Sequence, residues 1–412
     1  MKSLTSPILK AFAVLLFVLM ACAPWTVVSD FIGIVAVPTL FLCVGYFFNP
    51  SSVQSPAGFV EKRFRQYYLP FLGWAVLFLL LHNLWFPIGL LSHNGLNPAH
   101  SYSWHEFSQR LWSIGLNMSD YDELFAAPFW ILRALLVSSI GFMVLFILGR
   151  KMSRFENDKE VGWAIFVVSI ALLLWQVLGG LQVTGVAGGG YRELVGLLFI
   201  SIGFLFRQYR PTIDIDWRTY LLCLCVWVSV ALFYPVTMIP KADILHFIAL
   251  PIPAFAAYVL LLGAAELVGK NENMLTRALV YIGRHYLCIL AFHLLAFKLV
   301  SMLVVSVYGI EWQRVAEFPT IQTGRWWDFT WLLYLVVGVG FPLLVRYIYE
   351  RLTAGTQQSF GKWGDMLFDL LLFIVATILR ILKAILLGFY HFFLHFFRAL
   401  AEFLRASNPK DE

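Results

Sequence analysis

The chain has 412 residues, of which 60% are hydrophobic and only 13% are charged, with a formal net charge of +6. Because soluble domains carry about 25% charged residues, this composition excludes a soluble enzyme, a disordered protein and a nucleic-acid-binding domain. Its apolar runs are too long for the alternating strands of a barrel. The sequence therefore predicts an all-α, polytopic membrane bundle.

Ten membrane spans are predicted, since a helix needs about 20 apolar residues to cross ~30 Å of hydrocarbon. They form a predicted transmembrane domain of residues 1–352. The expected spans are residues 8–29, 31–48, 67–91, 126–148, 161–180, 191–206, 218–236, 243–263, 277–307 and 327–349.

The cations predict the orientation of these spans. Every even-numbered span ends on a basic side, whereas the opposite segments 92–125 and 181–190 contain Arg110 as their one cation. The positive-inside rule then predicts that both termini are cytoplasmic. We expect a multi-pass protein of the cell's inner (cytoplasmic) membrane. The cations on the predicted cytoplasmic side are Lys2, Lys10, Lys62, Arg63, Arg65, Arg150, Lys151, Arg154, Lys159, Arg207, Arg210, Arg218, Lys270, Arg277, Arg346, Arg351 and Lys362.

Residues 353–412 are predicted to form a separate cytoplasmic tail. Polar residues recur there at helical spacing among Leu, Ile and Phe, which predicts a long amphipathic helix over residues 363–405. Forty helical residues extend for ~60 Å, too far for one membrane crossing. Two interpretations stay open: a helix on the membrane lipids of the inner surface, or a helix that docks a protein partner.

Motifs for ATP or metal chemistry are missing from the sequence. It has no GxxxxGK[ST], no HExxH and no strand-borne GxGxxG. His391 and His395 have helical ligand spacing, but no third ligand is visible beside them. We therefore expect no metal.

A few ionisable residues fall inside the predicted spans, where each costs several kcal/mol and marks a functional hypothesis. Arg133 lies about two turns below the outer end of the fourth span, and His293 lies in the middle of the ninth with Lys298. Arg192 and Glu193 open the sixth span, as neighbours of one another or as partners of Arg133. The structural alternatives are a buried ion pair for Arg133 and an interhelical hydrogen bond for His293.

Five segments carry a family resemblance, in order along the chain. They are 37–48 (VPTLFLCVGYFF), 61–74 (EKRFRQYYLPFLGW), 127–135 (APFWILRAL), 199–207 (FISIGFLFR) and 281–293 (YIGRHYLCILAFH). Together they resemble the membrane acyltransferases of the acyltransferase-3 family, from residue 8 to about residue 350.

The resemblance implies acyl transfer, commonly of acetyl, from acyl-CoA on the cytoplasmic side to a hydroxyl of a surface or lipid-linked glycan. Such a reaction needs a base, because an alcohol is a weak nucleophile at neutral pH, and cations for the donor phosphates. The basic motif implies that role for Lys62, Arg63 and Arg65, whose alternative role is positive-inside anchoring. Trp130, Arg192 and Glu193 are further candidates for substrate binding.

The chain departs from the family pattern at the position of the catalytic base. The family uses a histidine in the first span, whereas Ala21 occupies that position here, and Val44 replaces the serine before Gly-Tyr. The substitute base would be His293, ahead of His82 and His246, with Arg133 as the second catalytic candidate.

Three hypotheses stay open. One is an O-acyltransferase with a cavity joining Arg63, Arg133 and His293. Another is a catalytically inactive relative that serves in polysaccharide export or assembly. The last is a scaffold whose work is done by the tail.

Overall fold

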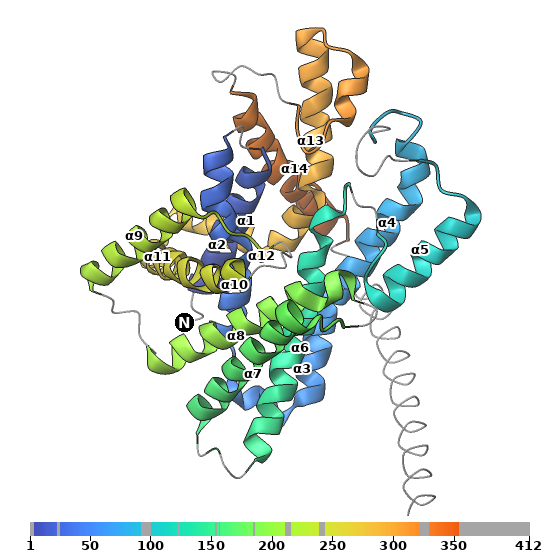
Figure 1. Ribbon diagram of the computed structural model, residues 1–412. Helices are drawn as coiled ribbons and strands as arrows, with labels where there is room; N and C mark the ends of the chain where they lie inside the picture. The colour runs from blue at the N-terminus through green and yellow to red at the C-terminus, as the bar shows by residue number, and fades with distance from the viewer. Residues whose placement is uncertain are drawn as a thin grey trace, which may run out of the picture. The chain divides into compact units, whose positions relative to one another are not determined.

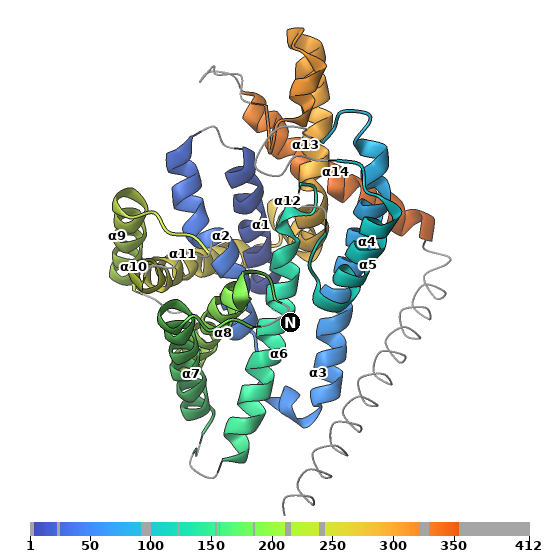
Figure 2. The same ribbon diagram turned by 45° about the vertical axis from the view of Figure 1, so that its right-hand side comes forward.

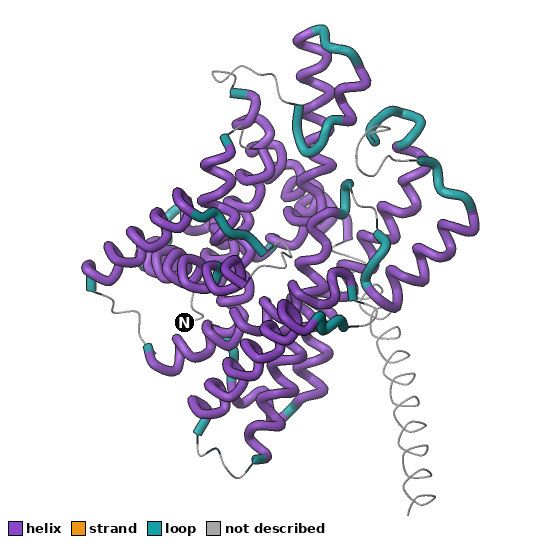
Figure 3. Tube along the Cα trace, viewed as in Figure 1, coloured by secondary structure: helices purple, strands orange, loops and turns teal. Residues whose placement is uncertain are grey.

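The computed structural model describes residues 4–22, 25–91, 100–121, 124–152, 155, 157–183, 186–210, 216–238, 244–321 and 329–353 (Figure 1). Those residues form helices joined by loops and contain no strand (Figure 3). The predicted fold class, a polytopic helical membrane bundle, is confirmed. The chain divides into two units, Met1–Glu350 and Arg351–Glu412. The predicted amphipathic helix 363–405 lies outside the described residues.

Nine helical segments of the described chain are long and apolar enough to cross a membrane, rather than ten. The predicted span 218–236 forms a shorter helix of 17 residues, α9. The helices are α1 Thr5–Cys22, α2 Thr26–Tyr46, α3 Pro56–Arg63, α4 Leu69–Trp85, α5 Trp104–Asn117, α6 Trp130–Lys151, α7 Asp158–Gly179, α8 Tyr191–Tyr209, α9 Trp217–Phe233, α10 Ile244–Ala249, α11 Pro251–Gly269, α12 Met274–Arg284, α13 Tyr286–Tyr308 and α14 Thr330–Thr353.

Several predicted boundaries were wrong. The predicted span 277–307 is two helices, because α12 ends at Arg284, with His285 as its C-cap, and α13 begins at Tyr286. Just before this break, Gly283 lies against the backbone of Pro7 in α1, where a side chain would not fit. The predicted span 67–91 begins earlier, since α3, a π-helical turn over Phe64–Tyr68 and α4 form one 30-residue segment.

The predicted outer loop 92–125 contains a helix. In both ribbon views α5 runs alongside α4 (Figures 1 and 2), and the Tyr68 hydroxyl donates to the Gly115 carbonyl oxygen at 2.5 Å. Tyr68 lies near the middle of the segment Pro56–Trp85. Helix α5 therefore folds back along α4, and its carboxyl end meets the residue that precedes α4.

The core of the bundle is built around α2, which packs most extensively against α8 and α1. Gly45 of α2 lies against the backbone of Ile200, and Gly203 of α8 lies against that of Leu42. Small residues let helices approach closely in a membrane, where van der Waals packing and hydrogen bonds drive association. This crossing holds α8, and therefore Arg192 and Glu193 at its start, in a fixed position.

Candidate functional site

The first candidate site is a buried ion pair between α6 and α8. The Arg133 Nε donates to Glu193 Oε1 at 2.7 Å, and the two side chains are only 3% and 5% exposed. Ser138 of α6 also donates to the Glu193 carbonyl oxygen at 2.7 Å. The structure thus brings Arg133 and Glu193 together, as one of the two sequence interpretations expected.

The carboxyl end of α5 completes the surroundings of Arg133. Met118, the residue after α5, has a left-handed backbone with φ 51°, and its carbonyl oxygen accepts from Arg133 Nη1 at 3.4 Å. The last carbonyls of a helix carry partial negative charge. Arg133 therefore lies between a carboxylate and a helix terminus, which stabilises its buried charge. The sequence analysis did not single out Met118.

The start of α8 leaves several polar atoms without partners. Arg192 lies with its guanidinium carbon 4.2 Å from the centroid of the Trp130 ring. The Tyr191 hydroxyl, Arg192 Nε and Glu193 Oε2 are buried and form no hydrogen bond with described residues. Because an unsatisfied buried polar group costs about 1–3 kcal/mol, these atoms suit a polar ligand.

Three consecutive glycines precede α8 and set its start. Gly188, Gly189 and Gly190 have φ of 65°, 62° and 82°, a region that residues with a side chain rarely adopt. The turn lets the chain enter α8 directly, with Arg192 and Glu193 in its first turn.

The second candidate site lies at the predicted cytoplasmic end of the helices, where the basic motif Lys62–Arg65 lies, and it contains Arg63. Arg63 is half-buried, and its Nη1 donates to Gln66 Oε1 at 3.1 Å and to the Tyr67 hydroxyl at 3.4 Å. Its buried Nε makes no hydrogen bond with described residues. Lys62 is exposed, and Arg65 pairs with Glu61 at 2.9 Å.

Helix geometry explains why the three predicted donor-binding cations separate. Arg63 and Tyr67 are four residues apart and share one face, whereas Arg65 is turned about 200° from Arg63. The π-helical turn Phe64–Tyr68 follows at once, and such turns are frequent at functional sites. Arg63 is therefore the inward member of the basic motif.

Two further residues join Arg63 that the sequence analysis did not single out for this site. Lys10 of α1 lies with Nζ 5.4 Å from the centroid of the Tyr286 ring. Tyr286, the first residue of α13, interacts through its hydroxyl with that of Tyr67. Residues from α1, from the π-helical turn and from α13 thus meet around Arg63.

The His293 ring lies deeper along α13 and is only 1% exposed. Its Nδ1 is 3.1 Å from the Ile289 carbonyl oxygen and 3.0 Å from that of Leu290. Because carbonyl oxygens only accept, this geometry assigns the proton to Nδ1 and leaves the lone pair on Nε2. His293 therefore has the tautomer that a general base requires.

His293 faces the first helix, where the family histidine is expected. Its ring packs edge-on against Phe17 of α1, with the ring centroids 5.6 Å apart. Lys10 and Phe17 are seven residues apart in α1, and their contact partners Tyr286 and His293 are seven residues apart in α13. The two helices therefore run parallel over this stretch, with the same spacing between contacts. Ala21 is one turn beyond Phe17, about 6 Å along the axis.

The other buried histidines and Lys298 hold loops in place. His82 Nε2 is 3.0 Å from the His100 carbonyl oxygen, and His246 Nε2 is 2.8 Å from that of Thr237. Lys298 Nζ donates to the carbonyl oxygens of Val315 and Glu317 at 2.9 and 2.7 Å. These hydrogen bonds account for their burial without catalysis.

Aromatic rings link His293 to the start of α6. Phe292 packs on Trp74 with ring centroids 5.7 Å apart, and Trp74 lies 6.4 Å from Phe129, the residue before Trp130. Phe78 contacts both Phe292 and Phe129. These ring contacts connect the surroundings of His293 with the start of α6, where Trp130 lies.

Most of the chain matches one protein-family model. Residues 5–348 match the family model described as an acyltransferase domain, acyltransferase-3. Neither the search of curated proteins nor the search of solved structures returned a match. The matched range contains both candidate clusters and His293.

Proposed function

We propose, since the chain belongs to the acyltransferase-3 family, that this membrane protein is an O-acyltransferase with His293 as its base. The donor is an acyl-CoA such as acetyl-CoA, and the acceptor is a hydroxyl of a surface or lipid-linked glycan. The observation that carries the proposal is the geometry of His293, whose Nδ1 is held by two main-chain carbonyls beside α1.

In the proposed reaction, His293 Nε2 takes the proton of the acceptor hydroxyl as its oxygen attacks the acyl carbon. The new carbon–oxygen ester bond forms, the carbon–sulfur bond of the donor breaks, and the departing CoA thiolate receives a proton. No external oxidant or reductant is needed.

The proposed donor site is the cluster of Arg63, Lys10, Tyr67 and Tyr286. A cation with a buried, unbonded Nε suits a phosphate oxygen, because charge-assisted hydrogen bonds are the strong ones. Tyr286 and His293 are two turns apart on α13, about 10 Å. Phosphates at the cation-rich end would thus direct the acyl group inward along α13. Lys62 and Arg65 would add positive charge at the surface beside this cluster, on the same side of the membrane.

The proposed acceptor site is the cluster at the start of α8. Glu193 Oε2, Arg192 Nε and the Tyr191 hydroxyl offer an acceptor and donors for sugar hydroxyls, beside the Trp130 ring. Arg133 would hold the Glu193 side chain in position. The proposal adopts the predicted orientation, an inner-membrane protein with cytoplasmic termini, in which Arg63 faces the compartment that contains acyl-CoA.

Ala21 favours a second candidate function. A methyl group accepts no proton, and without the family base the chain would be an inactive relative in polysaccharide export or assembly. In that case the contact between His293 and Phe17 would serve helix packing alone. The helix predicted over residues 363–405 would then be the docking element for a protein partner.

An acyl-transfer assay distinguishes the O-acyltransferase from the inactive relative. The purified full-length chain in lipid nanodiscs receives acetyl-CoA with a lipid-linked glycan fraction from the producing cells, and both CoA thiol release and ester formation are followed. We expect acceptor-dependent turnover that falls about 100-fold or more in His293→Ala, and stays near wild type in His246→Ala, a matched buried histidine. An unchanged rate in His293→Ala would eliminate this base. Absence of acyl turnover in the wild-type chain, together with glycan flux across sealed vesicles that contain it, would support the inactive relative.

A further inference from the structure

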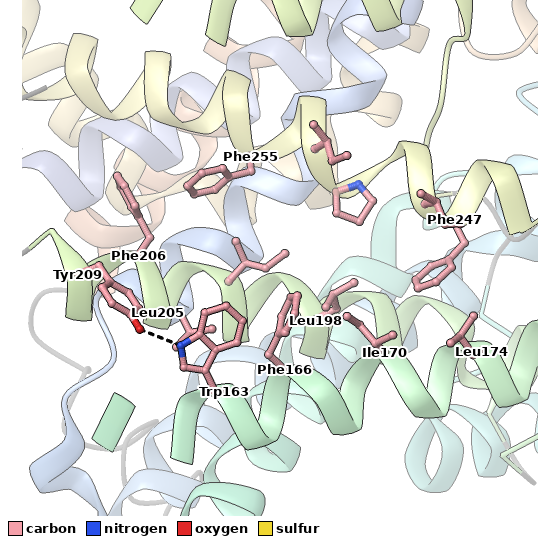
Figure 4. A pocket seen from close by; sticks show the side chains of 14 residues that line it. Trp163, Phe166, Ile170, Leu174, Leu198, Leu205, Phe206, Tyr209, Phe247 and Phe255 are labelled. Carbon is pink, nitrogen blue, oxygen red and sulfur yellow. Dashed lines mark hydrogen bonds between the residues drawn. The ribbon is translucent and has the colours of Figure 1, made fainter. Parts of the chain in front are cut away.

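A second feature of the fold is an apolar groove between α7, α8 and the α10–α11 segment. Its volume is about 670 Å³, within the ~300–1,000 Å³ typical of ligand pockets. Phe166 and Ile170 of α7, Ile202 of α8, and Ile252 and Phe255 of α11 line it (Figure 4). The proposed reaction uses none of these residues.

The length of the groove matches one leaflet of a bilayer. Along α7 it extends from Trp163 to Leu174, eleven residues or about 16 Å of helix. The hydrocarbon core of a membrane is ~30 Å thick, so the groove covers about half of it. Two of its lining residues, Ile248 and Ile252, are 53% and 61% exposed, which makes the groove accessible from the membrane side.

One end of the groove is polar. Trp163 Nε1 donates to the Tyr209 hydroxyl at 2.9 Å, so the Tyr209 proton stays available for another acceptor. Lys159 Nζ lies 5.1 Å from the centroid of the Tyr209 ring. Two carboxylates flank Lys159 in the sequence: Asp158 is held by Arg150 at 2.6 Å, and Glu160 accepts from Asn157 Nδ2 at 2.9 Å. This end therefore offers a cation, a hydroxyl donor and the two aromatic rings typical of a membrane interface.

We infer that this groove binds an acyl chain of an anionic phospholipid from the cation-rich leaflet, with the phosphate group at Lys159 and Tyr209. The apolar walls receive the chain, and the opposite end, at Leu174 and Phe247, is apolar as the chain terminus requires. The charge at Lys159 selects an anionic headgroup over a zwitterionic one. The inference is independent of the proposed acyl transfer.

Native mass spectrometry of the purified full-length chain tests the site with phosphatidylglycerol and phosphatidylcholine at equal concentrations. We expect phosphatidylglycerol to bind about fivefold more tightly, the factor that corresponds to ~1 kcal/mol per lysine near an anionic headgroup. Lys159→Gln should remove this preference, whereas Lys151→Gln, an exposed cation at the end of α6, should keep it.

Substitutions that fill the groove test whether it binds the acyl chain of the lipid. Ile170→Trp should weaken binding of both lipids about tenfold, while Val167→Trp, at a 59% exposed position of the same helix, should bind as wild type does. Ile252→Trp, from the opposite wall, repeats the test should Ile170→Trp fail to fold by circular dichroism. Equal binding of the two lipids by wild type, wild-type binding by both filled variants, or retention of a polyprenyl phosphate in place of phosphatidylglycerol would overturn the inference.

Discussion

The Arg133–Glu193 pair allows a sharp test, because stability and activity can be separated there. At a distance of 2.7 Å, unit charges attract by about 6 kcal/mol at an effective dielectric of ~20, and burial offsets much of that attraction. Arg133→Met leaves the Glu193 carboxylate buried without its cation. We expect it to lower the free energy of unfolding by ~3–5 kcal/mol.

The double variant Arg133→Met/Glu193→Leu should recover most of this loss, since apolar residues often replace a buried pair at little cost. The Met118 carbonyl, which Arg133 also contacts, would retain a deficit of about 1 kcal/mol. Denaturant unfolding of the detergent-solubilised chain measures both values. The acyl-transfer assay on the folded double variant should show no turnover, because the proposed acceptor site is gone.

Two outcomes would refute this reasoning. A loss below ~1 kcal/mol in Arg133→Met would mean that the pair does not carry the energy assigned to a buried contact. Wild-type turnover in the double variant would leave the pair with a structural role only. Ser139→Ala is a suitable control, because its buried hydroxyl bonds within α6 to the Leu136 carbonyl oxygen.

Three further predictions concern the segments around the sites. Tyr68→Phe removes the hydrogen bond to α5 and should cost ~0.5–1.5 kcal/mol, with faster hydrogen exchange in residues 104–117. Lys298→Met leaves two carbonyls without their donor and should cost ~2–3 kcal/mol; unchanged exchange in residues 312–317 would contradict it. Burial lowers the pKa of His285 below its ordinary 6.5, against the attraction of Glu350, so stability is complete above pH 6.5 and declines below it. His285→Asn should flatten that decline between pH 7.5 and 5.5, and an unchanged slope would argue against burial as its cause.

Much of the fold could be predicted from composition and length. Apolar runs of about 20 residues give most of the spans directly, because hydrocarbon thickness sets the length of a helix. The break at His285 lies inside a segment predicted as one span, 277–307. Helix α5 lies inside the predicted outer loop 92–125, although Ser103 caps its first turn three residues before Glu106. Its packing on α4 depends on Tyr68, a long-range contact that no local pattern encodes.

The candidate site could likewise be predicted in part from the sequence. The cost of burying charge singled out Arg133, Glu193 and His293 from the sequence, and the structure brings the first two together. The separation of Arg63 from Arg65 follows from helix geometry once the helix is placed. The roles of Lys10 and Tyr286 depend on how α1 and α13 pack, and no local pattern encodes that contact.

The most direct test of the account is the affinity of the full-length chain for acetyl-CoA, measured by isothermal titration calorimetry in nanodiscs. Arg63 and Arg65 are a matched pair of arginines in one motif: Arg63 donates to the Tyr67 hydroxyl, and Arg65 is paired with Glu61. We predict that Arg63→Gln binds acetyl-CoA about tenfold or more weakly than wild type, and that Arg65→Gln stays within about twofold. Equal losses in the two variants, or no binding by wild type, would contradict a donor site at Arg63.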